Sequence, residues 1–411
     1  MRILHVSPLY PPVLGGAELH LKMLSEELVA RGHSVTVFTA NVTDGTGAWL
    51  SRYGNLPEEE IINGVRVVRF DPRRGRAERA LDGLLRMRGG WRTVNSLLSP
   101  SGRELLLQGP RTFGMIGAIF RAKADVVASM NWYWPQAYYT HLAGRFRRIP
   151  LVGIPLFHTA QPWCSRPVYE RMLARCDGLA AATSHEKEYA ERRGAKGADV
   201  VGVGVEMEDP EARDGARVRS RYGLGDFPVV GYVGQQLAAK GVAKLIEAMP
   251  WVWHWNPETR LVLAGKSVGD PEVEGALRSL SAPERARVVQ IGRFEDGEKA
   301  SIFDAFDVFA MPSKEDSFGI VYLEAWLCRK PVIGARIGST QCVIDEGRDG
   351  LLVDPESAED LARAIVSLLS NGELRAAMAE AGRAKTVARH TWDKVTDRME
   401  SLYTRVVGSR A

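Results

Sequence analysis

The chain has 411 residues, of which 45% are hydrophobic and 25% charged, and its formal net charge is +4. This length exceeds what one hydrophobic core usually serves and predicts two domains of about 150–200 residues each. The small net charge gives no indication of a nucleic-acid-binding protein, and no window approaches the 18 uncharged apolar residues of a membrane-spanning helix.

The N-terminus and the cysteines indicate the compartment. "MRILHVSPLYPP" passes directly from a short apolar run into prolines, which is not a signal-peptide pattern. The cysteines Cys164, Cys176, Cys328 and Cys342 have neither CxxC nor zinc spacing and predict reduced thiols. We therefore expect a cytoplasmic protein.

The first half of the chain alternates strands with helices. A strand is expected over 2–6, with His5 as a core residue. An amphipathic helix is expected over 17–32 and a second strand over 34–40. This βαβ order implies parallel strands. Further strands are expected at 65–70, 124–130 and 149–154, and then within 178–183 and 197–206.

The second half follows a polar stretch, 206–226, and repeats the alternation. Strands are expected at 228–234, 260–265, 287–292, 307–312, 331–335 and 350–354, with helices between most of them and helices from 358 onward. The sequence predicts two doubly wound α/β domains. Ligands of such sheets bind beyond the carboxyl ends of the strands.

"SKEDSFGIVYLE" (313–324) places acids in an otherwise apolar segment. Asp316 precedes the expected helix start at Gly319, and Glu324 follows it by about one turn. One interpretation is a binding site, because a helix N-terminus favours phosphate and carboxylates accept hydrogen bonds from sugar hydroxyls. The alternative is an acid pair favoured by the helix dipole, plus a solvated Glu324.

Lys240 lies in "GYVGQQLAAKG", just after the strand expected at 228–234. This segment is not a Walker A loop, because Val242 stands where that motif needs Ser or Thr. Lys240 is either a phosphate-binding point charge or an ordinary surface lysine.

Two more candidate site features follow expected strands of the first half. Gly15 and Gly16 precede the first helix, where paired glycines permit unusual φ angles or close approach of a ligand; a simple turn is the alternative. His158 follows the strand that ends near Ile154, and it is either a site residue or a structural histidine.

A basic segment covers 73–92, with seven arginines against Glu78 and Asp82. Apolar residues are interleaved, so the segment suits an anionic membrane surface or an anionic acceptor; a solvated loop is the alternative. The aromatic group 131–139 suits a sugar or lipid site or core packing.

These motifs, in this order, resemble the family 4 glycosyltransferases, which are retaining enzymes with the two-domain GT-B fold. The resemblance runs from "GGAE" through "VGQQLAAKG", "PSKEDSFGIVYLEAWLCRKPVIGA" and "DGLLVDP" to the helix after "TW". It implies two Rossmann-like domains that face a cleft. Residues 1–205, completed by a C-terminal helix at 391–411, would bind the acceptor, and 206–390 would bind the nucleotide sugar.

The resemblance also implies residue roles. Asp316 and Glu324 correspond to the two acids of the family's E-x7-E motif, which contact the donor sugar and the ribose. Lys240 corresponds to the phosphate-binding lysine, and the backbone of Ser317, Phe318, Gly319 and Ile320 would face the diphosphate. His158 would lie beside the donor sugar, with Gly15 and Gly16 in the N-terminal glycine loop. Gln235, Glu315 and Arg293 are assigned to donor binding as well.

The sequence departs from the family pattern at three positions: Asp316 replaces a glutamate, Gln235 stands where arginine is usual, and Cys342 stands where glutamate is common. We expect a hexosyltransferase that uses a nucleotide diphosphate sugar, with no cofactor and no metal. The expected acceptor is a glycan, a lipid-linked or a small molecule. The alternatives are a nucleotide-sugar isomerase such as a 2-epimerase, and a weakly active binding subunit.

Overall fold

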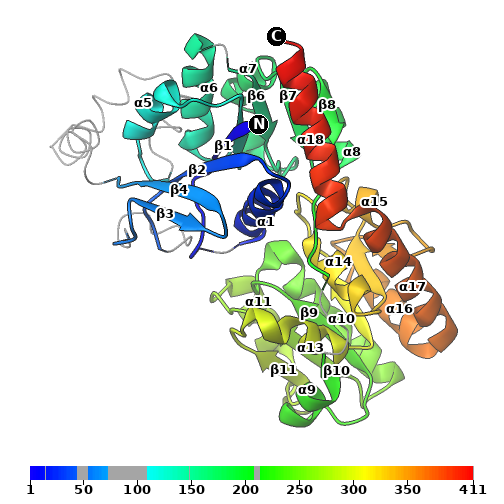
Figure 1. The fold of residues 1–411 in the computed structure, drawn as a ribbon. Coiled ribbons are helices and arrows are strands. Elements are labelled where there is room, and N and C mark those ends of the chain that lie inside the picture. Colours follow the sequence, from blue (N-terminus) through cyan, green and yellow to red (C-terminus); the bar gives the residue numbers. More distant parts are fainter. Residues whose placement is uncertain (14, 44–53, 73–108, 148, 208–212, 411) are drawn as a thin grey trace, which may run out of the picture. The chain divides into compact units, whose positions relative to one another are not determined.

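The computed structural model describes residues 1–13, 15–43, 54–72, 109–147, 149–207 and 213–410. Its contacts divide the chain into two compact units (Figure 1). Unit 1 comprises Met1–Val203 together with Trp392–Ala411, and unit 2 comprises Gly204–Thr391. In the described ranges, no helix combines the length and apolarity needed to cross a bilayer.

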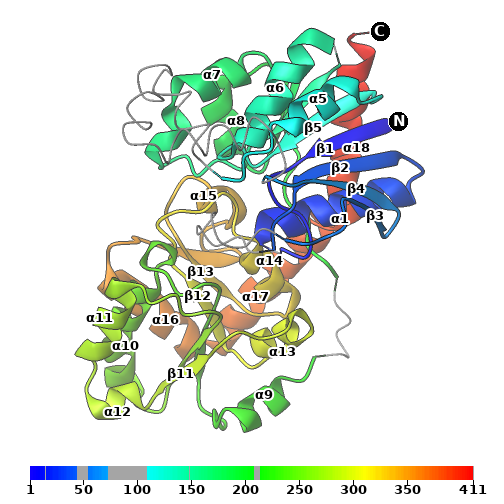
Figure 2. The ribbon, with the colours of Figure 1, turned by 90° about the vertical axis from the view of Figure 1, so that its left-hand side faces the viewer.

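Unit 1 contains an eight-stranded sheet with the order β3-β4-β2-β1-β5-β6-β7-β8, part of which is visible in Figure 2. Seven strands are parallel, as predicted, and β3 runs antiparallel to β4. The strands are β1 (Arg2–Val6), β2 (Ser34–Ala40), β3 (Glu59–Ile62), β4 (Val65–Phe70), β5 (Val126–Met130), β6 (Leu151–Ile154), β7 (Gly178–Ala181) and β8 (Ala198–Val200).

The edge strand β3 was not predicted from the sequence. Its residues "EEII" alternate between exposed and half-buried positions, so the apolar pattern is weak. The connection to β4 is the pair Asn63 and Gly64, both with positive φ (48° and 82°). Two such residues form the tight hairpin turn whose twist suits antiparallel strands.

Helices cover both faces of this sheet. They are α1 (Gly16–Ala30), α5 (Gly114–Arg121), α6 (Pro135–Arg147), α7 (Pro167–Leu173), α8 (Ser184–Glu191) and α18 (Trp392–Gly408). Neighbouring residues of one strand enter different cores, since Ile3 packs with α1 and α18 whereas Leu4 packs with α5 to α8. The predicted C-terminal helix is therefore part of the first unit (Figure 1).

His5, in β1, lies between the sheet and the helices α1 and α18, and it is fully buried, which confirms it as a core residue. Its Nδ1 lies 2.8 Å from Ser25 Oγ and its Nε2 lies 2.9 Å from Tyr403 Oη. Ser25 donates its proton to the Leu21 carbonyl oxygen, so it accepts from Nδ1–H, and Nε2 accepts from Tyr403. One neutral tautomer satisfies all of these bonds.

The stability of unit 1 is expected to fall as the pH drops below about 6.5. Burial lowers the pKa of His5 to about 3 and that of His20 to about 4, so between these values and 6.5 the unfolded chain binds more protons. In this range each histidine lowers the free energy of unfolding by up to about 1.4 kcal/mol for each unit by which the pH falls. Burial raises the pKa of Glu186 to about 7 and also raises the pKa of Glu18, so these two carboxyls bind protons more readily in the folded state and oppose part of the loss.

Urea titrations at pH 7 and pH 5 measure this dependence. His20→Gln is expected to reduce the difference between the two midpoints. The exposed His254→Gln serves as the control and is expected to leave that difference unchanged. Equal pH dependence in the wild type and His20→Gln would contradict the proposal that a buried neutral His20 contributes.

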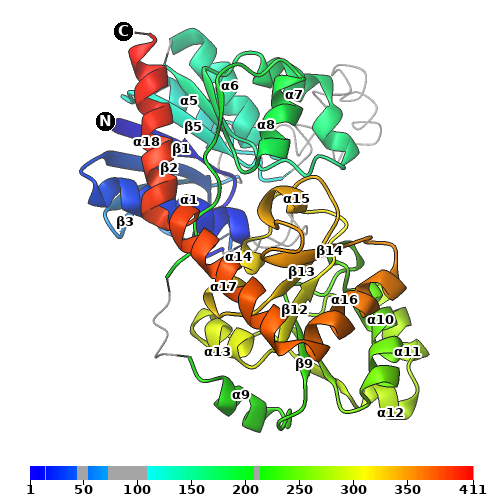
Figure 3. The same ribbon diagram turned by 90° about the vertical axis from the view of Figure 1, so that its right-hand side faces the viewer.

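Unit 2 contains six parallel strands in the order β11-β10-β9-β12-β13-β14, and Figure 3 shows β9, β12, β13 and β14 in that sequence. All six strands predicted for the second half are present. They are β9 (Val229–Val233), β10 (Arg260–Ala264), β11 (Val288–Ile291), β12 (Val308–Met311), β13 (Val332–Ala335) and β14 (Gly350–Val353). These strands are buried except for most of β11, the first residue of β10 and Leu351 in β14, as expected for a sheet covered on both faces.

The helices of unit 2 alternate with these strands. They are α9 (Gly215–Arg221), α10 (Val242–Trp255), α11 (Pro271–Ser279), α12 (Ala282–Arg285), α13 (Lys299–Asp304), α14 (Ile320–Leu327), α15 (Thr340–Val343), α16 (Ala358–Ser370) and α17 (Gly372–Arg389). Numbered within the unit, the strand order is 3-2-1-4-5-6, which is that of a Rossmann-like sheet. Its order reverses between β9 and β12, so the loops after these two strands border the usual ligand site.

Candidate active site

The loop after β9 ends in a short 3₁₀ helix, Ala238–Lys240. The Tyr232 hydroxyl donates to the Gln235 carbonyl oxygen at 2.7 Å, which fixes the start of the loop, and the Gln235 side chain is exposed. Gly241 ends it with φ 79°, and a Cβ there would overlap the carbonyl oxygen of Pro312. Only glycine therefore allows this loop to approach the end of β12 so closely.

The loop after β12 is bonded directly to the first loop. The Lys314 amide donates to the Ala239 carbonyl oxygen at 2.9 Å, and Ser313 Oγ lies 2.7 Å from the Glu315 carbonyl oxygen and 3.2 Å from that of Ala239. Ser339 Oγ donates to the Asp316 carbonyl oxygen at 2.6 Å. These bonds hold both loops at the point where the strand order reverses.

Lys240 and Asp316 meet across the two loops. Lys240 Nζ lies 3.0 Å from Asp316 Oδ2 and 3.1 Å from the Glu315 carbonyl oxygen. Their side chains are 28% and 11% exposed, so the pair is only partly screened by water. An ammonium group has three N–H donors, and these two contacts leave one for a ligand. The sequence predicted both residues but not their ion pair.

The N-terminus of α14 lies in the same loop. Gly319 is its N-cap, with φ 89°, and no side chain caps the helix. The amide N–H groups of Ser317, Gly319 and Ile320 make no hydrogen bond to another described residue. The Phe318 amide donates to Asp316 Oδ1 at 3.4 Å. The unbonded amides and the positive end of the helix dipole together form a setting for an anion.

The side chain of Phe318 is buried, and its ring lies 5.4 Å from that of His390. Its predicted contribution to a site therefore belongs to the backbone alone. Ile320 is half-buried at the first position of α14, and Glu315 contributes its carbonyl oxygen to Lys240. Arg293 is exposed, two residues beyond β11.

Glu324 has an ionic partner that the sequence did not reveal. Lys299 Nζ, from the first position of α13, lies 2.8 Å from Glu324 Oε1. Glu324 Oε2 is buried and has no hydrogen-bond partner among the described residues. Glu324 is thus not on the solvated stripe of a helix, and its second oxygen could accept a hydrogen bond from a hydroxyl group.

The glycine pair of unit 1 lies at the start of α1, and its backbone conformation differs from the one expected. Gly15 is the N-cap of α1 with φ −130°, an extended conformation open to any residue, and neither Gly15 nor Gly16 has a positive φ. The expectation of unusual φ angles is wrong. A Cβ on Gly15 would instead lie 2.5 Å from Glu18 Oε2, so a larger residue there would make the buried Glu18 carboxylate move.

His158 lies half-buried in the loop after β6, at the carboxyl edge of the first sheet. Its carbonyl oxygen accepts from the Gln161 amide at 2.8 Å and from Cys164 Sγ at 3.2 Å. The predicted residues therefore form two groups: Gly15, Gly16 and His158 in unit 1, and all the others in unit 2. The basic segment 73–92 lies outside the described residues.

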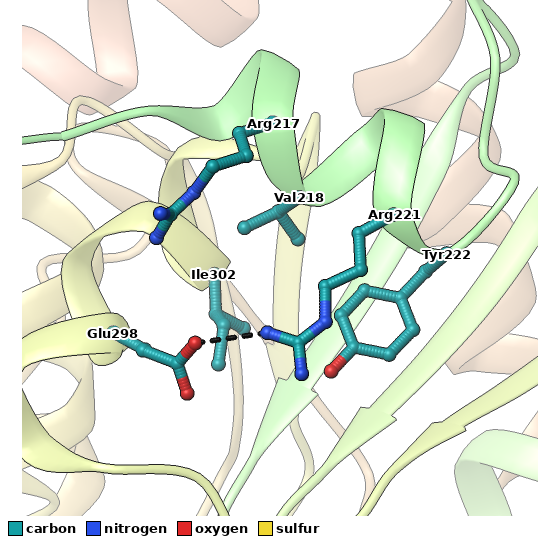
Figure 4. Close-up of a pocket in the computed structure, with 6 residues that line it drawn as sticks. All are labelled: Arg217, Val218, Arg221, Tyr222, Glu298 and Ile302. Atoms are coloured by element: carbon teal, nitrogen blue, oxygen red, sulfur yellow. Dashed lines mark hydrogen bonds and ion pairs between the residues drawn. The ribbon is translucent and has the colours of Figure 1, made fainter.

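Two hollows of unit 2 contain paired charges. The hollow between α9 and α13 measures about 10 Å³, which is room for about one water molecule; Arg221 bonds Glu298 there at 3.0 Å (Figure 4). The other, about 260 Å³, lies between α17 and residues 345–349, and its Lys385 pairs with Asp349. Neither hollow is lined by the loops that follow β9 and β12.

Two family models match the chain over most of its length. One, described as "Glycosyl transferase 4-like domain", matches residues 15–205, and the other, "Glycosyl transferases group 1", matches residues 217–385. The chain belongs to the group 1 glycosyltransferases. This assignment agrees with the resemblance inferred from the motifs around Lys240 and Asp316.

Relatives of this glycosyltransferase include the D-inositol 3-phosphate glycosyltransferase of Stackebrandtia nassauensis, which is 28% identical over 99% of this chain and 91% of the relative. A GDP-mannose-dependent alpha-(1-6)-phosphatidylinositol monomannoside mannosyltransferase of Mycolicibacterium smegmatis is 32% identical over 56% of this chain and 64% of the relative. Both are named as transferases, so the isomerase and binding-subunit alternatives gain no support from them.

Solved structures show that this glycosyltransferase has the GT-B fold. Anabaena HepE in complex with UDP and glucose has a TM-score of 0.74 at 18% identity and covers 98% of this chain and 100% of that one. Sucrose-phosphate synthase from Thermosynechococcus elongatus has a TM-score of 0.73 at 20% identity, with both chains covered completely.

Proposed function

We propose that this glycosyltransferase moves a hexosyl unit from a nucleotide diphosphate sugar to an acceptor hydroxyl with retention of anomeric configuration. The observation that carries the proposal is the meeting of Lys240, Asp316 and the N-terminus of α14 at the reversal point of the second sheet. A cation, unbonded amides and a carboxylate within two adjoining loops suit a diphosphate that bears a sugar.

Unit 2 would bind the donor. Lys240 and the amides of Ser317, Gly319 and Ile320 would contact the diphosphate, Asp316 the sugar hydroxyls and Glu324 the ribose. Arg293 and the exposed Gln235 stay predicted donor contacts. HepE was solved with UDP-glucose, whereas the mannosyltransferase relative is named as GDP-mannose-dependent, so both donors belong in the assay.

Unit 1 would bind the acceptor, and His158 would lie beside the donor sugar. The names of the relatives favour acceptors that carry an inositol phosphate, either free or within a phosphatidylinositol glycolipid. We retain as predictions a cytoplasmic location and a peripheral contact of 73–92 with an anionic membrane. Cosedimentation with anionic and with neutral vesicles tests that contact.

The reaction would break the bond between the anomeric carbon and the diphosphate oxygen, and the bonding electrons leave with the diphosphate. Lys240 and the helix dipole stabilise that developing charge. The acceptor oxygen forms its bond to the anomeric carbon from the same face, and its proton passes to the leaving phosphate oxygen. Water exclusion by residues around the donor prevents hydrolysis.

The test is turnover with UDP-, GDP- and ADP-sugars against an acceptor panel that includes inositol 3-phosphate, with NMR of the product anomer. An α-linked product from an α-linked donor supports retention, and an inverted product contradicts it. Assays with and without EDTA test the predicted independence from metal. Conversion of the donor without any acceptor would favour the isomerase.

Loss of the Glu324 carboxylate is expected to raise the donor KM. Glu324→Gln removes the charge that holds Lys299 and leaves one acceptor oxygen, so we expect an increase of about 10-fold, or roughly 1.4 kcal/mol. Lys299→Met is expected to raise the donor KM less, about 3-fold, because Glu324 keeps both oxygens. Steady-state kinetics with varied donor measures both.

Glu298→Gln is the control for these variants. Glu298 precedes Lys299 but pairs with the exposed Arg221, so its loss is expected to leave the donor KM unchanged. Unchanged KM values in Glu324→Gln would place the ribose elsewhere.

A further inference from the structure

Glu186 is a buried acid for which the proposed reaction has no role. It lies in the first turn of α8, is 1% exposed, and forms no ion pair with any described residue. A buried carboxylate without a cation is costly unless hydrogen bonds to its oxygens compensate. Its contacts therefore indicate what it does in the structure.

The carboxylate bridges the ends of two neighbouring strands. Oε1 accepts from the Phe157 amide at 2.6 Å, and Oε2 accepts from the Ala182 amide at 2.6 Å. Phe157 follows β6 and directly precedes His158, whereas Ala182 follows β7. β6 and β7 pair at Val152↔Gly178 and Gly153↔Leu179. The Glu186 carboxylate therefore links the two chain segments beyond the last paired residues.

Further contacts hold Phe157 and Thr159, the residues on either side of His158. The Phe157 ring lies 5.9, 6.3 and 5.7 Å from those of Trp132, Tyr169 and Tyr189. Thr159 Oγ1 lies 2.9 Å from Nε2 of His185, the residue before Glu186. Contacts from the first turn of α8 thus fall on both sides of His158.

The loop also contains backbone strain. Leu156 has φ 51°, an unusual conformation for a bulky residue, which costs about 1–3 kcal/mol and persists only where surrounding contacts impose it. The bond from the Phe157 amide to Glu186 is the first contact after this strained residue. A carboxylate suits the task because it accepts two N–H groups at once, whereas an amide side chain has one acceptor oxygen.

We propose that Glu186 is a positioning residue for His158: by binding the Phe157 amide it fixes the backbone that carries the His158 side chain. The inference rests on the proposed role of His158 in the transfer reaction. It assigns Glu186 no contact with substrate, and its effect passes through His158 alone.

A double-mutant cycle tests the proposal. Glu186→Gln is expected to lower kcat about 30-fold with little change in donor KM, because small misplacements of a reacting group cost up to about 10²-fold. In the background of His158→Ala, the same change is expected to have no further effect on kcat. Glu188→Gln, on the exposed side of α8, is the control and should match the wild type.

The outcomes are distinct. Wild-type activity in His158→Ala would reject the role of His158 in the proposed function. A His158→Ala variant with a reduced but measurable kcat, together with equal losses from Glu186→Gln in both backgrounds or no loss in either, would overturn the role of Glu186 alone.

Glu186→Asp is a second variant, shorter by one methylene, which keeps the charge but draws the carboxylate away from the Phe157 amide. It is expected to fold and to lose kcat as Glu186→Gln does. If neither variant folds while Glu188→Gln does, Glu186 serves stability, and the proposal is wrong.

Discussion

Replacing Lys240 with alanine is expected to lower kcat/KM for transfer about 10³-fold. The change removes a cation that would stabilise the leaving diphosphate, a loss typically worth about 10²–10³ in rate, and it leaves the mostly buried Asp316 carboxylate without its partner. Asp316 would then lose the orientation in which it meets a sugar hydroxyl. Steady-state kinetics with the best donor measures the loss.

Lys244 offers a matched control for Lys240. It lies one turn further along the chain, in α10, and pairs with Glu247 on the surface at 2.7 Å. Lys244→Ala is expected to change activity by less than 2-fold, because exposed ion pairs contribute little. Equal activity in Lys240→Ala and Lys244→Ala would mean that the diphosphate binds elsewhere.

Gly241→Ala is expected to destabilise unit 2 by roughly 2–5 kcal/mol. The left-handed conformation costs a residue with a Cβ about 1–2 kcal/mol, and the overlap with the Pro312 carbonyl oxygen adds about 1–3 kcal/mol. Relief of that overlap would separate the loops that join Lys240 to Asp316, so activity should fall as well. Urea unfolding of unit 2 measures the stability.

Two other glycine variants separate the cost of the left-handed conformation from the cost of the overlap with Pro312. Gly269 has φ 71° but open space around it, so Gly269→Ala should show only the cost of the conformation. Gly275 lies within α11 with nothing near, so Gly275→Ala should be neutral or stabilising by up to about 1 kcal/mol. If Gly241→Ala lowers the free energy of unfolding by no more than Gly269→Ala does, the inferred overlap with the Pro312 carbonyl oxygen is wrong.

The strands of both sheets were largely predictable because parallel strands buried on both faces are short apolar runs, and those runs are distinct in this sequence. The exception was β3, whose "EEII" lies on the edge of a sheet and is half exposed. The pair Asn63 and Gly64 was the available signal for its hairpin, since both residues adopt positive φ readily.

The candidate site was predictable where it depends on local motifs, and not where it depends on packing between helices. Lys240, Asp316 and Glu324 belong to recognisable segments. Lys299 does not, because only the packing of α13 against α14 brings it to Glu324. Glu186 had a signal in "TSHE", which matches the Thr-x-x-Glu pattern of a helix N-terminus, but its two strand-end amides follow from the sheet order.

The place of α18 in unit 1 has a consequence for synthesis on the ribosome. Leu402 and Val406 fill the space beside Gly178, and Tyr403 completes the bonds of His5. These residues are translated only after the whole of 204–391 has been synthesised. Until then, the part of the first sheet that α18 covers stays exposed beside α1, while the later-made half already has all its strands and helices and can fold first.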